Sequence, residues 1–103
     1  GEILEKYKNK IINIHPSLLP KYGGKGMYGL KVHQAVFENG DKESGCTVHY
    51  VISNVDAGEI IAQDKVDISM AKSPEEIQKI VLEREWKLLP RVVKELIKKS
   101  INN

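Results

Sequence analysis

The sequence predicts an α/β fold built from three strands and two helices. Short runs rich in β-branched residues, at 10–15, 45–53 and 59–68, are typical of strands. Apolar residues with helical spacing, at 30–38 and again after residue 74, predict the helices. The chain has 103 residues, which is enough for one modest domain. Because a three-stranded sheet gives such a domain a marginal core, we interpret the chain as half of a larger domain.

The N-terminal part predicts a helix end, a strand and a loop, in that order. Apolar residues within 2–8 have helical spacing, and we interpret this segment as the end of a short helix. Strand 10–15 ends at His15, because Pro16 lacks an N–H and disfavours helical backbone in the residue before it. Two prolines and three glycines within 16–28 predict an irregular loop.

The central part predicts a short helix followed by a strand pair. Helix 30–38 is expected to end at Asn39 and Gly40. We expect this helix to place His33 on the surface, whereas Cys46 is expected to be a buried small apolar residue. Strands 45–53 and 59–68 are expected to pair antiparallel, because their short connection leaves no room for the crossover that parallel neighbours need.

The C-terminal part predicts one long helix. Ser73 is placed to cap it, Pro74 fits its first position, and Glu76 completes a capping box. Trp86 is expected to pack against the rest of the molecule. We expect Pro90 to kink the helix, because a proline removes one hydrogen bond and costs ~3 kcal/mol in a helix interior.

Composition excludes several functional classes. The net charge is +2, too small a bias to indicate a nucleic acid partner. No apolar run approaches the ~20 residues of a membrane span, so no membrane partner is predicted. The single Cys46 cannot close an internal disulfide, which favours a reducing compartment and hence a cytoplasmic location. Cysteine and histidine lack metal-ligand spacing, so no metal is predicted.

A glycine pattern in the loop imitates a dinucleotide-binding motif. Residues 24–29 read GKGMYG and match G-x-G-x-x-G. That motif binds a pyrophosphate only where it joins a strand directly to a helix. Here residues 16–23 separate it from the strand, and no acidic residue stands at a suitable position downstream. We therefore reject a nicotinamide site and interpret the segment as a surface loop.

Two polar residues near the end of the first strand could carry chemistry. Asn13 and His15 are two positions apart, so their side chains are expected on the same face. They stand at the C-terminal end of the strand, where ligands bind in open α/β sheets. An amide and an imidazole together can stabilise an oxyanion and transfer a proton. For an isolated pair of this kind, hydrogen bonds to the adjacent turn would be the better explanation.

The surrounding sequence favours the functional interpretation. Three runs, NIHPSLLP at 13–20, GCTVHYV at 45–51 and DAGEIIAQ at 56–63, resemble the folate-dependent formyltransferase family, over residues 10 to 90. Pro16 and the run KYGGKG at 21–26 resemble the branch of the family that formylates glycinamide ribonucleotide. The resemblance implies the C-terminal half of a Rossmann-like formyltransferase domain, with one parallel strand, an antiparallel strand pair and a long C-terminal helix. Residues 1–103 would be its catalytic, folate-side portion, without the N-terminal phosphate-binding half.

The resemblance implies a reaction of one-carbon metabolism. A formyl group would pass from 10-formyltetrahydrofolate, as co-substrate, to the amine of 5-phosphoribosylglycinamide in purine (IMP) biosynthesis. Asn13 would donate a hydrogen bond to the oxyanion, and His15, held protonated by Asp56, would supply a proton to the departing nitrogen. The implied folate-binding residues are Asn13, Ile52, Ser53, Asn54, Val55 and Asp56, and the implied ribonucleotide-binding residues are Leu82, Glu83, Arg84 and Glu85.

Three alternatives stay open at this stage. Glu85 would contact the ribose or be a solvated surface charge, and His49 would orient the site or serve a structural role. The chain would belong to another folate-dependent formyltransferase or hydrolase, or be an inactive folate-binding fragment. We expect little turnover from the chain alone, and we expect its exposed sheet edge to favour homodimers.

Overall fold

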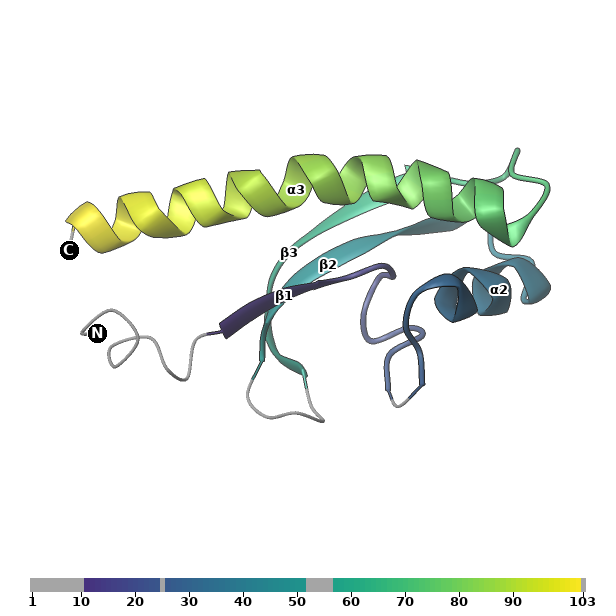
Figure 1. Cartoon of the computed structure of the whole chain (residues 1–103), viewed down its shortest axis with the longest axis horizontal. Coiled ribbons are helices and arrows are strands. Elements are labelled where there is room, and N and C mark those ends of the chain that lie inside the picture. The colour runs from purple at the N-terminus through teal and green to yellow at the C-terminus, as the bar shows by residue number, and fades with distance from the viewer. Residues whose placement is uncertain (1–10, 25, 52–56, 103) are drawn as a thin grey trace.

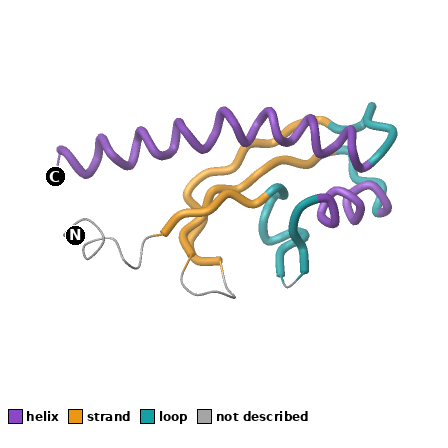
Figure 2. Tube along the Cα trace, in the orientation of Figure 1, coloured by secondary structure: helices purple, strands orange, loops and turns teal. Residues whose placement is uncertain are grey.

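The computed structural model describes residues 11–24, 26–51 and 57–102. Three strands and two helices follow one another in the order strand, helix, strand, strand, helix. Figure 1 shows the long helix α3 lying along one side of the sheet. Figure 2 shows the loops gathered at the end of the molecule that also holds α2. The elements are β1 (Ile11–His15), α2 (Leu30–Glu38), β2 (Glu43–Val51), β3 (Ala57–Asp67) and α3 (Pro74–Asn102).

The three strands form one sheet in the order β1-β2-β3, and both pairs are antiparallel. The predicted antiparallel pairing of β2 with β3 is therefore confirmed. The register sets His15 opposite Thr47 and Asn13 opposite His49. The strand expected to be parallel, β1, has an antiparallel neighbour in β2, and its second edge has no strand partner within the described ranges.

The core lies between the sheet and the two helices. Cys46 and Val48 of β2 are fully buried in it, and the burial predicted for Cys46 is confirmed. Ile12 and Ile14 pack against this core from β1. Its fully or nearly buried apolar members are Val32, Val36, Cys46, Val48, Ile68, Ile77, Val81, Leu88 and Val92.

Two side chains lie opposite to their predicted positions. His33 was expected on the surface but is only 1% exposed, because its position falls on the same side of α2 as Val32 and Val36. Trp86 was expected to pack but is 68% exposed. At 3.6 residues per turn it lies about 140° around α3 from the buried Val81, on the side away from the core.

Helix α3 begins at Pro74 with Ser73 as its cap, as the sequence predicts, but only half of the predicted capping box forms. The Glu76 N–H donates to Ser73 Oγ at 3.2 Å, while the Glu76 carboxylate accepts from the Lys72 N–H at 3.3 Å rather than from Ser73. Pro90 lies inside the helix, which continues through it as one element to Asn102. Figure 1 shows α3 as one continuous ribbon, and the kink expected at Pro90 stays a prediction. Within the described part of the chain, neither helix has the length and apolarity needed to cross a membrane.

Candidate active site

Asn13 and His15 lie on the face of β1 that turns away from the core. Ile12 and Ile14 pack against the core, and successive side chains of a strand point to opposite faces. Asn13 is exposed and His15 is half-buried. An amide and an imidazole therefore stand on the same side of the sheet, two positions apart.

The His15 ring is fixed by the loop that follows β1. Its Nε2 lies 3.0 Å from the backbone oxygen of Tyr22. A carbonyl oxygen can only accept a hydrogen bond, so Nε2–H is the donor. In the neutral ring the proton is then on Nε2, and the lone pair is on Nδ1.

Thr47 attaches the same loop to the sheet. Its Oγ1 donates to the Ser17 carbonyl at 2.7 Å and accepts from the Leu19 N–H at 3.1 Å. It also accepts from Gln63 Nε2 at 3.0 Å, and that amide donates to the Leu19 carbonyl at 2.9 Å. These contacts use the whole hydrogen-bonding capacity of the hydroxyl, one donor and two acceptor sites. The loop therefore has a defined position over β2.

Gly45 lets the loop approach the strand closely. A Cβ at this position would lie 2.8 Å from Leu18 Cδ2, and it would collide with the backbone oxygen of Asp64 on β3. Both contacts are closer than real Cβ atoms allow. The site thus needs glycine at position 45.

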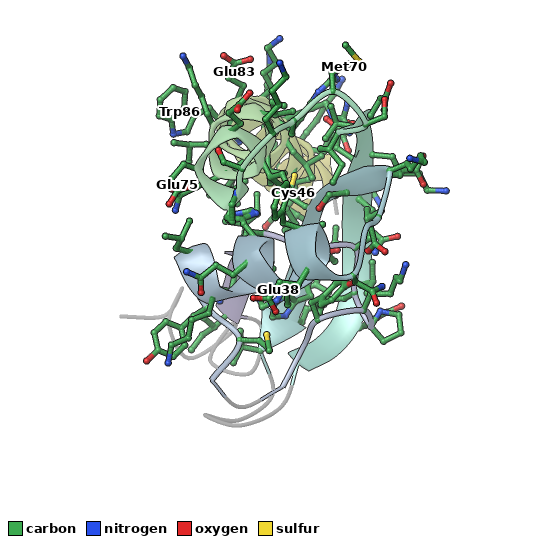
Figure 3. The ribbon with its side chains drawn as sticks, turned by 90° about the vertical axis from the view of Figure 1, so that its right-hand side faces the viewer. Glu38, Cys46, Met70, Glu75, Glu83 and Trp86 are labelled. Atoms are coloured by element: carbon green, nitrogen blue, oxygen red, sulfur yellow. The ribbon has the colours of Figure 1, made fainter. Side chains whose placement is uncertain are left out.

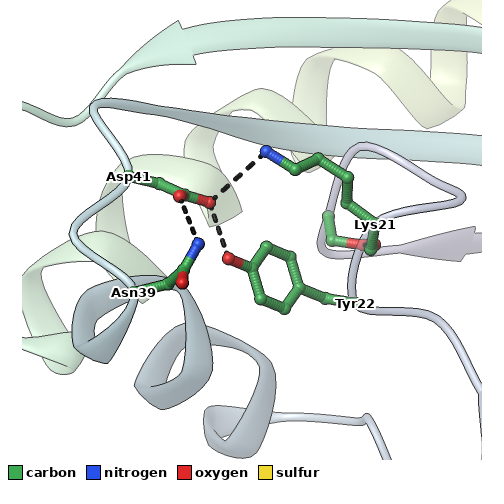
Figure 4. Close-up of polar contacts among 5 residues, drawn as sticks. Lys21, Tyr22, Asn39 and Asp41 are labelled. Atoms are coloured by element: carbon green, nitrogen blue, oxygen red, sulfur yellow. Dashed lines mark hydrogen bonds and ion pairs between the residues drawn. The ribbon is translucent and has the colours of Figure 1, made fainter.

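Four polar residues join the loop to the turn after α2, and Figure 4 shows their contacts. Tyr22 OH donates to Asp41 Oδ2 at 2.7 Å, and Asn39 Nδ2 donates to Asp41 Oδ1 at 2.9 Å. Lys21 Nζ lies 3.7 Å from Asp41 Oδ2. We refer to Lys21, Tyr22, Asn39 and Asp41 as the loop anchor.

Two groups of the loop anchor, the Tyr22 hydroxyl and the Asp41 carboxyl, have shifted pKa values. Burial, followed by the hydrogen bond to Asp41, raises the pKa of Tyr22. The hydrogen bond from Tyr22 is the main cause that lowers the pKa of Asp41. Tyr22 therefore keeps its proton while Asp41 is ionised. Sequence reasoning missed this cluster, because no local pattern connects two residues that are 19 positions apart.

Two further histidines are buried near this region. His49, beside Asn13 in the register, is 5% exposed, and its Nδ1–H donates to the Tyr50 carbonyl at 3.0 Å. Burial, followed by the charge of His15, lowers the pKa of His33. Its Nδ1 has no hydrogen-bond partner among the residues that the structure describes. The hydrogen bond from His49 to the Tyr50 carbonyl is compatible with both roles considered for His49, orienting the site and stabilising the structure.

The four side chains of the α3 segment that is predicted to bind the ribonucleotide differ in exposure. Leu82 and Glu83 are exposed, and Figure 3 shows Glu83 and Trp86 on the outer side of α3 with Cys46 beneath it. Arg84 Nη1 lies 3.9 Å from Asp64 Oδ2. Glu85 is half-buried, and burial raises the pKa of its carboxyl group.

Residues 52–56, which include the predicted Asp56 and folate-binding segment, lie outside the described residues. The flanking positions Val51 and Ala57 pair with each other, and Val51 also pairs with Ile11. Ile11 is four positions from His15 along β1, or about 13 Å at 3.3 Å per residue. The proposed contact between Asp56 and His15 stays a prediction. Among the described residues, no group of three or more acidic, histidine or cysteine side chains could hold a metal ion.

Comparison with known proteins identifies the family. A family model described as "Formyl transferase" matches residues 1–93. The chain belongs to the formyl transferase family. This confirms the resemblance noted in the sequence.

Two proteins similar to this formyl transferase chain have the same name. A protein of Arabidopsis thaliana named "Phosphoribosylglycinamide formyltransferase, chloroplastic" is 48% identical over 92 residues, which cover 89% of this chain and 32% of that protein. The Haemophilus influenzae protein named phosphoribosylglycinamide formyltransferase is 44% identical over 90 residues, covering 87% of this chain and 40% of that protein.

A solved structure confirms the predicted fold class. The crystal structure of phosphoribosylglycinamide formyltransferase from Anaplasma phagocytophilum is similar with a TM-score of 0.77 and 34% identity. The similarity covers 95% of this formyl transferase chain and 44% of that structure. The chain thus spans between about a third and a half of the length of the relatives that it matches.

Proposed function

We propose that this chain is the catalytic portion of an enzyme that transfers a formyl group from 10-formyltetrahydrofolate to the amine of 5-phosphoribosylglycinamide. The observation that carries the proposal is the placement of Asn13 and His15 together on the face of β1 away from the core, with the His15 ring fixed by Tyr22. The names of the relatives support the choice of acceptor. A donor amide and a proton-carrying imidazole are the groups that formyl transfer needs.

The reaction divides between these two residues as follows. The substrate amine attacks the formyl carbon, a C–N bond forms, and the formyl oxygen becomes an oxyanion. Asn13 donates a hydrogen bond to this oxygen. Its exposed side chain is accessible to a substrate. The bond from the formyl carbon to the folate nitrogen then breaks, and His15 supplies the proton that the nitrogen takes. The attacking nitrogen gives up one proton as the new amide forms. Asp56 is proposed to assist the removal of this proton through a water and to hold the imidazole in its charged form.

Substrate binding is assigned to two segments. Residues Ile52 to Asp56 are proposed to contact the folate. Of the α3 segment from Leu82 to Glu85, Glu85 is the best candidate to accept hydrogen bonds from ribose hydroxyls. It is half-buried beside the sheet, whereas Arg84 lies against Asp64 and the other two side chains point into solvent.

The proposed location of the protein is a reducing compartment. Cys46 is the one cysteine of the sequence, and its buried thiol supports a reducing compartment. Plant relatives are named chloroplastic, so the proposal is a reducing compartment and is not limited to the cytoplasm.

The experiment uses a chimera, because the chain covers 40% of the Haemophilus influenzae relative. The part of that relative that this chain does not match is joined to this chain, and formyl transfer is measured with both substrates. His15→Ala is expected to lower kcat by ~10²–10⁴, and Asn13→Ala by ~10²–10³. Gln34→Ala, an exposed position on α2, is the control and should leave turnover unchanged.

Two outcomes would contradict the proposal. Turnover that survives both substitutions would remove Asn13 and His15 from the mechanism. A folded chimera that binds folate but formylates no acceptor would identify a binding module instead of an enzyme.

A further inference from the structure

We infer that Tyr22 and Asp41 are positioning residues for His15, and that they reserve Nδ1 of its ring as the nitrogen that exchanges a proton. The catalytic meaning of this inference rests on the proposed function. The geometric part stands on the contacts of the loop anchor alone and can be tested without turnover.

The first step is the bond between His15 and the loop. Nε2–H donates to the Tyr22 carbonyl at 3.0 Å. Any proton exchange through Nε2 would break this bond, whereas exchange through Nδ1 leaves it intact. The position of one backbone carbonyl therefore decides which ring nitrogen is available for chemistry.

The second step is the backbone of Tyr22 itself. Its φ is +56°, in the left-handed region that a bulky residue rarely adopts. Such a conformation is strained and persists only where the surroundings fix it. The carbonyl that receives the His15 proton thus belongs to a residue that needs an external anchor.

The third step is that anchor. Asp41 accepts from Tyr22 OH with one oxygen and from Asn39 with the other. Its own N–H donates to the Val36 carbonyl at 3.3 Å, at the end of α2. Because Asp41 is charged, its bond to the phenol is of the strong, charge-assisted kind. A continuous series of contacts thus runs from the end of α2 through Asp41 and Tyr22 to His15.

The test reads the tautomer of His15 by two-bond ¹H–¹⁵N correlation spectra of this labelled chain, at a pH where imidazole is neutral. The native chain should show His15 with its proton on Nε2 alone. Tyr22→Phe removes only the hydroxyl and should give a mixture of both tautomers. Tyr28→Phe is the matched control, because Tyr28 is exposed and lies beside Lys31 outside the loop anchor; it should leave the native tautomer.

A second pair of variants separates positioning from loss of folding. Asp41→Asn keeps an oxygen that accepts from Tyr22 OH and should retain most of the Nε2–H form, whereas Asp41→Ala should behave as Tyr22→Phe does. A native chain with the proton on Nδ1, or a Tyr22→Phe variant that keeps only the Nε2–H tautomer, would overturn the inference.

The chimera adds a catalytic measurement. Tyr22→Phe should lower kcat by roughly 10- to 100-fold with little change in KM, because a misplaced catalytic group costs rate rather than binding. An altered tautomer with unchanged kcat would refute the positioning role. A chimera that is inactive in every form would refute the proposed function, while the tautomer spectra would still decide the geometry.

Discussion

Glu85 places a carboxyl group in an environment that lowers the stability of the fold. Its carboxyl group is half-buried against the sheet, and burial raises its pKa. Burial is the main cause that raises the pKa of Cys46 to about 12, and the charge of the Glu85 carboxylate is the next. A buried charge without a cationic partner weakens a fold, so a function in substrate binding would explain why a carboxylate stands there.

Glu85→Gln is therefore expected to have opposite effects on stability and on binding. The raised pKa means that the ionised form is disfavoured in the folded state, so folding becomes less favourable as the pH rises through the titration of this group. The amide removes that cost, and the melting temperature at neutral pH should rise. In the chimera, KM for the ribonucleotide should increase about tenfold, as expected for one lost hydrogen bond to a charged group.

Thermal melts and steady-state kinetics on the same preparations measure both effects. Glu95→Gln, at an exposed position on the same helix outside the segment from Leu82 to Glu85, is the control and should change neither. An unaltered KM in the Glu85→Gln chimera would mean that Glu85 is a solvated charge without a function in binding.

At the scale of elements, Thr47 and Asp41 attach the loop after β1 to the rest of the fold, beside the bond from Gln63 to Leu19. Thr47 binds it to β2 through Ser17 and Leu19, and Asp41 binds it to the end of α2 through Tyr22. The loop lacks regular structure, so these side chains replace the ladder of bonds that a helix or strand would supply.

Thr47→Val tests the first attachment. Valine has the shape of threonine without the hydroxyl, so the Leu19 N–H and the Ser17 carbonyl lose their common partner. Leaving buried polar groups unsatisfied costs ~1–3 kcal/mol, and the free energy of unfolding in urea should fall by this amount. Thr47→Ser keeps the hydroxyl and should be much closer to the parent. Equal stability of the valine variant and the parent would show that the attachment is weak.

Asp41 makes the second attachment sensitive to acid. Its pKa in the folded chain lies below the ordinary value, so its contribution to stability is complete above the unfolded pKa of ~3.9 and is lost as the pH falls below it. The difference in melting temperature between the parent and Asp41→Asn should be largest near neutral pH and shrink below about pH 4. A difference that stays constant across this range would contradict the assigned cause.

Local signals in the sequence predicted these elements well. Asn39 and Gly40 mark the end of α2 at Glu38, and Ser73 and Pro74 mark the start of α3. Each of these signals acts within a few residues, so the sequence alone contains it. The same applies to Asn13 and His15, whose common face follows from the period of a strand.

Contacts between distant segments were beyond such reasoning. The bond between Tyr22 and Asp41 depends on how the loop folds over the turn after α2. The burial of His33 and the exposure of Trp86 depend on which side of each helix meets the core. Periodicity shows that a helix has an apolar side, but α3 has apolar residues on two sides, and only the packing decides between them.

The whole molecule is elongated and leaves apolar surface uncovered. Its dimensions are 47 × 25 × 17 Å and its radius of gyration is 14.9 Å, against about 13 Å for a compact domain of 100 residues. On α3, one exposed stripe follows helical spacing along the side away from the core. Its members are Leu82, Trp86, Val93, Ile97 and Ile101.

This stripe is expected to cause self-association of the isolated chain. Exposed apolar surface of this extent favours contact between copies, so sedimentation velocity should show species larger than a monomer as concentration rises. Replacing Ile97 and Ile101 together by lysine should shift the distribution to monomer. The unfolding free energy should change by no more than about 0.5 kcal/mol per position, because both side chains are exposed.

Lys87→Ala, on the same helix and also exposed, is the control and should associate as the parent does. A parent chain that stays monomeric at every concentration would show that the stripe does not hold two copies together. In the relatives, more than half of the chain lies outside the matched region, so a chain of that length has further segments that could cover such a stripe.

The bare α-carbon at position 45 limits how this protein can vary. Even one methyl group there would press on the carbonyl of residue 64 and on the tip of residue 18, forcing β3 and the loop away from β2. Since the loop also holds the carbonyl that binds the imidazole of His15, such a replacement would disturb the proposed catalytic histidine from a distance, without altering the histidine itself. Design or mutational drift in this chain therefore has no freedom at this glycine.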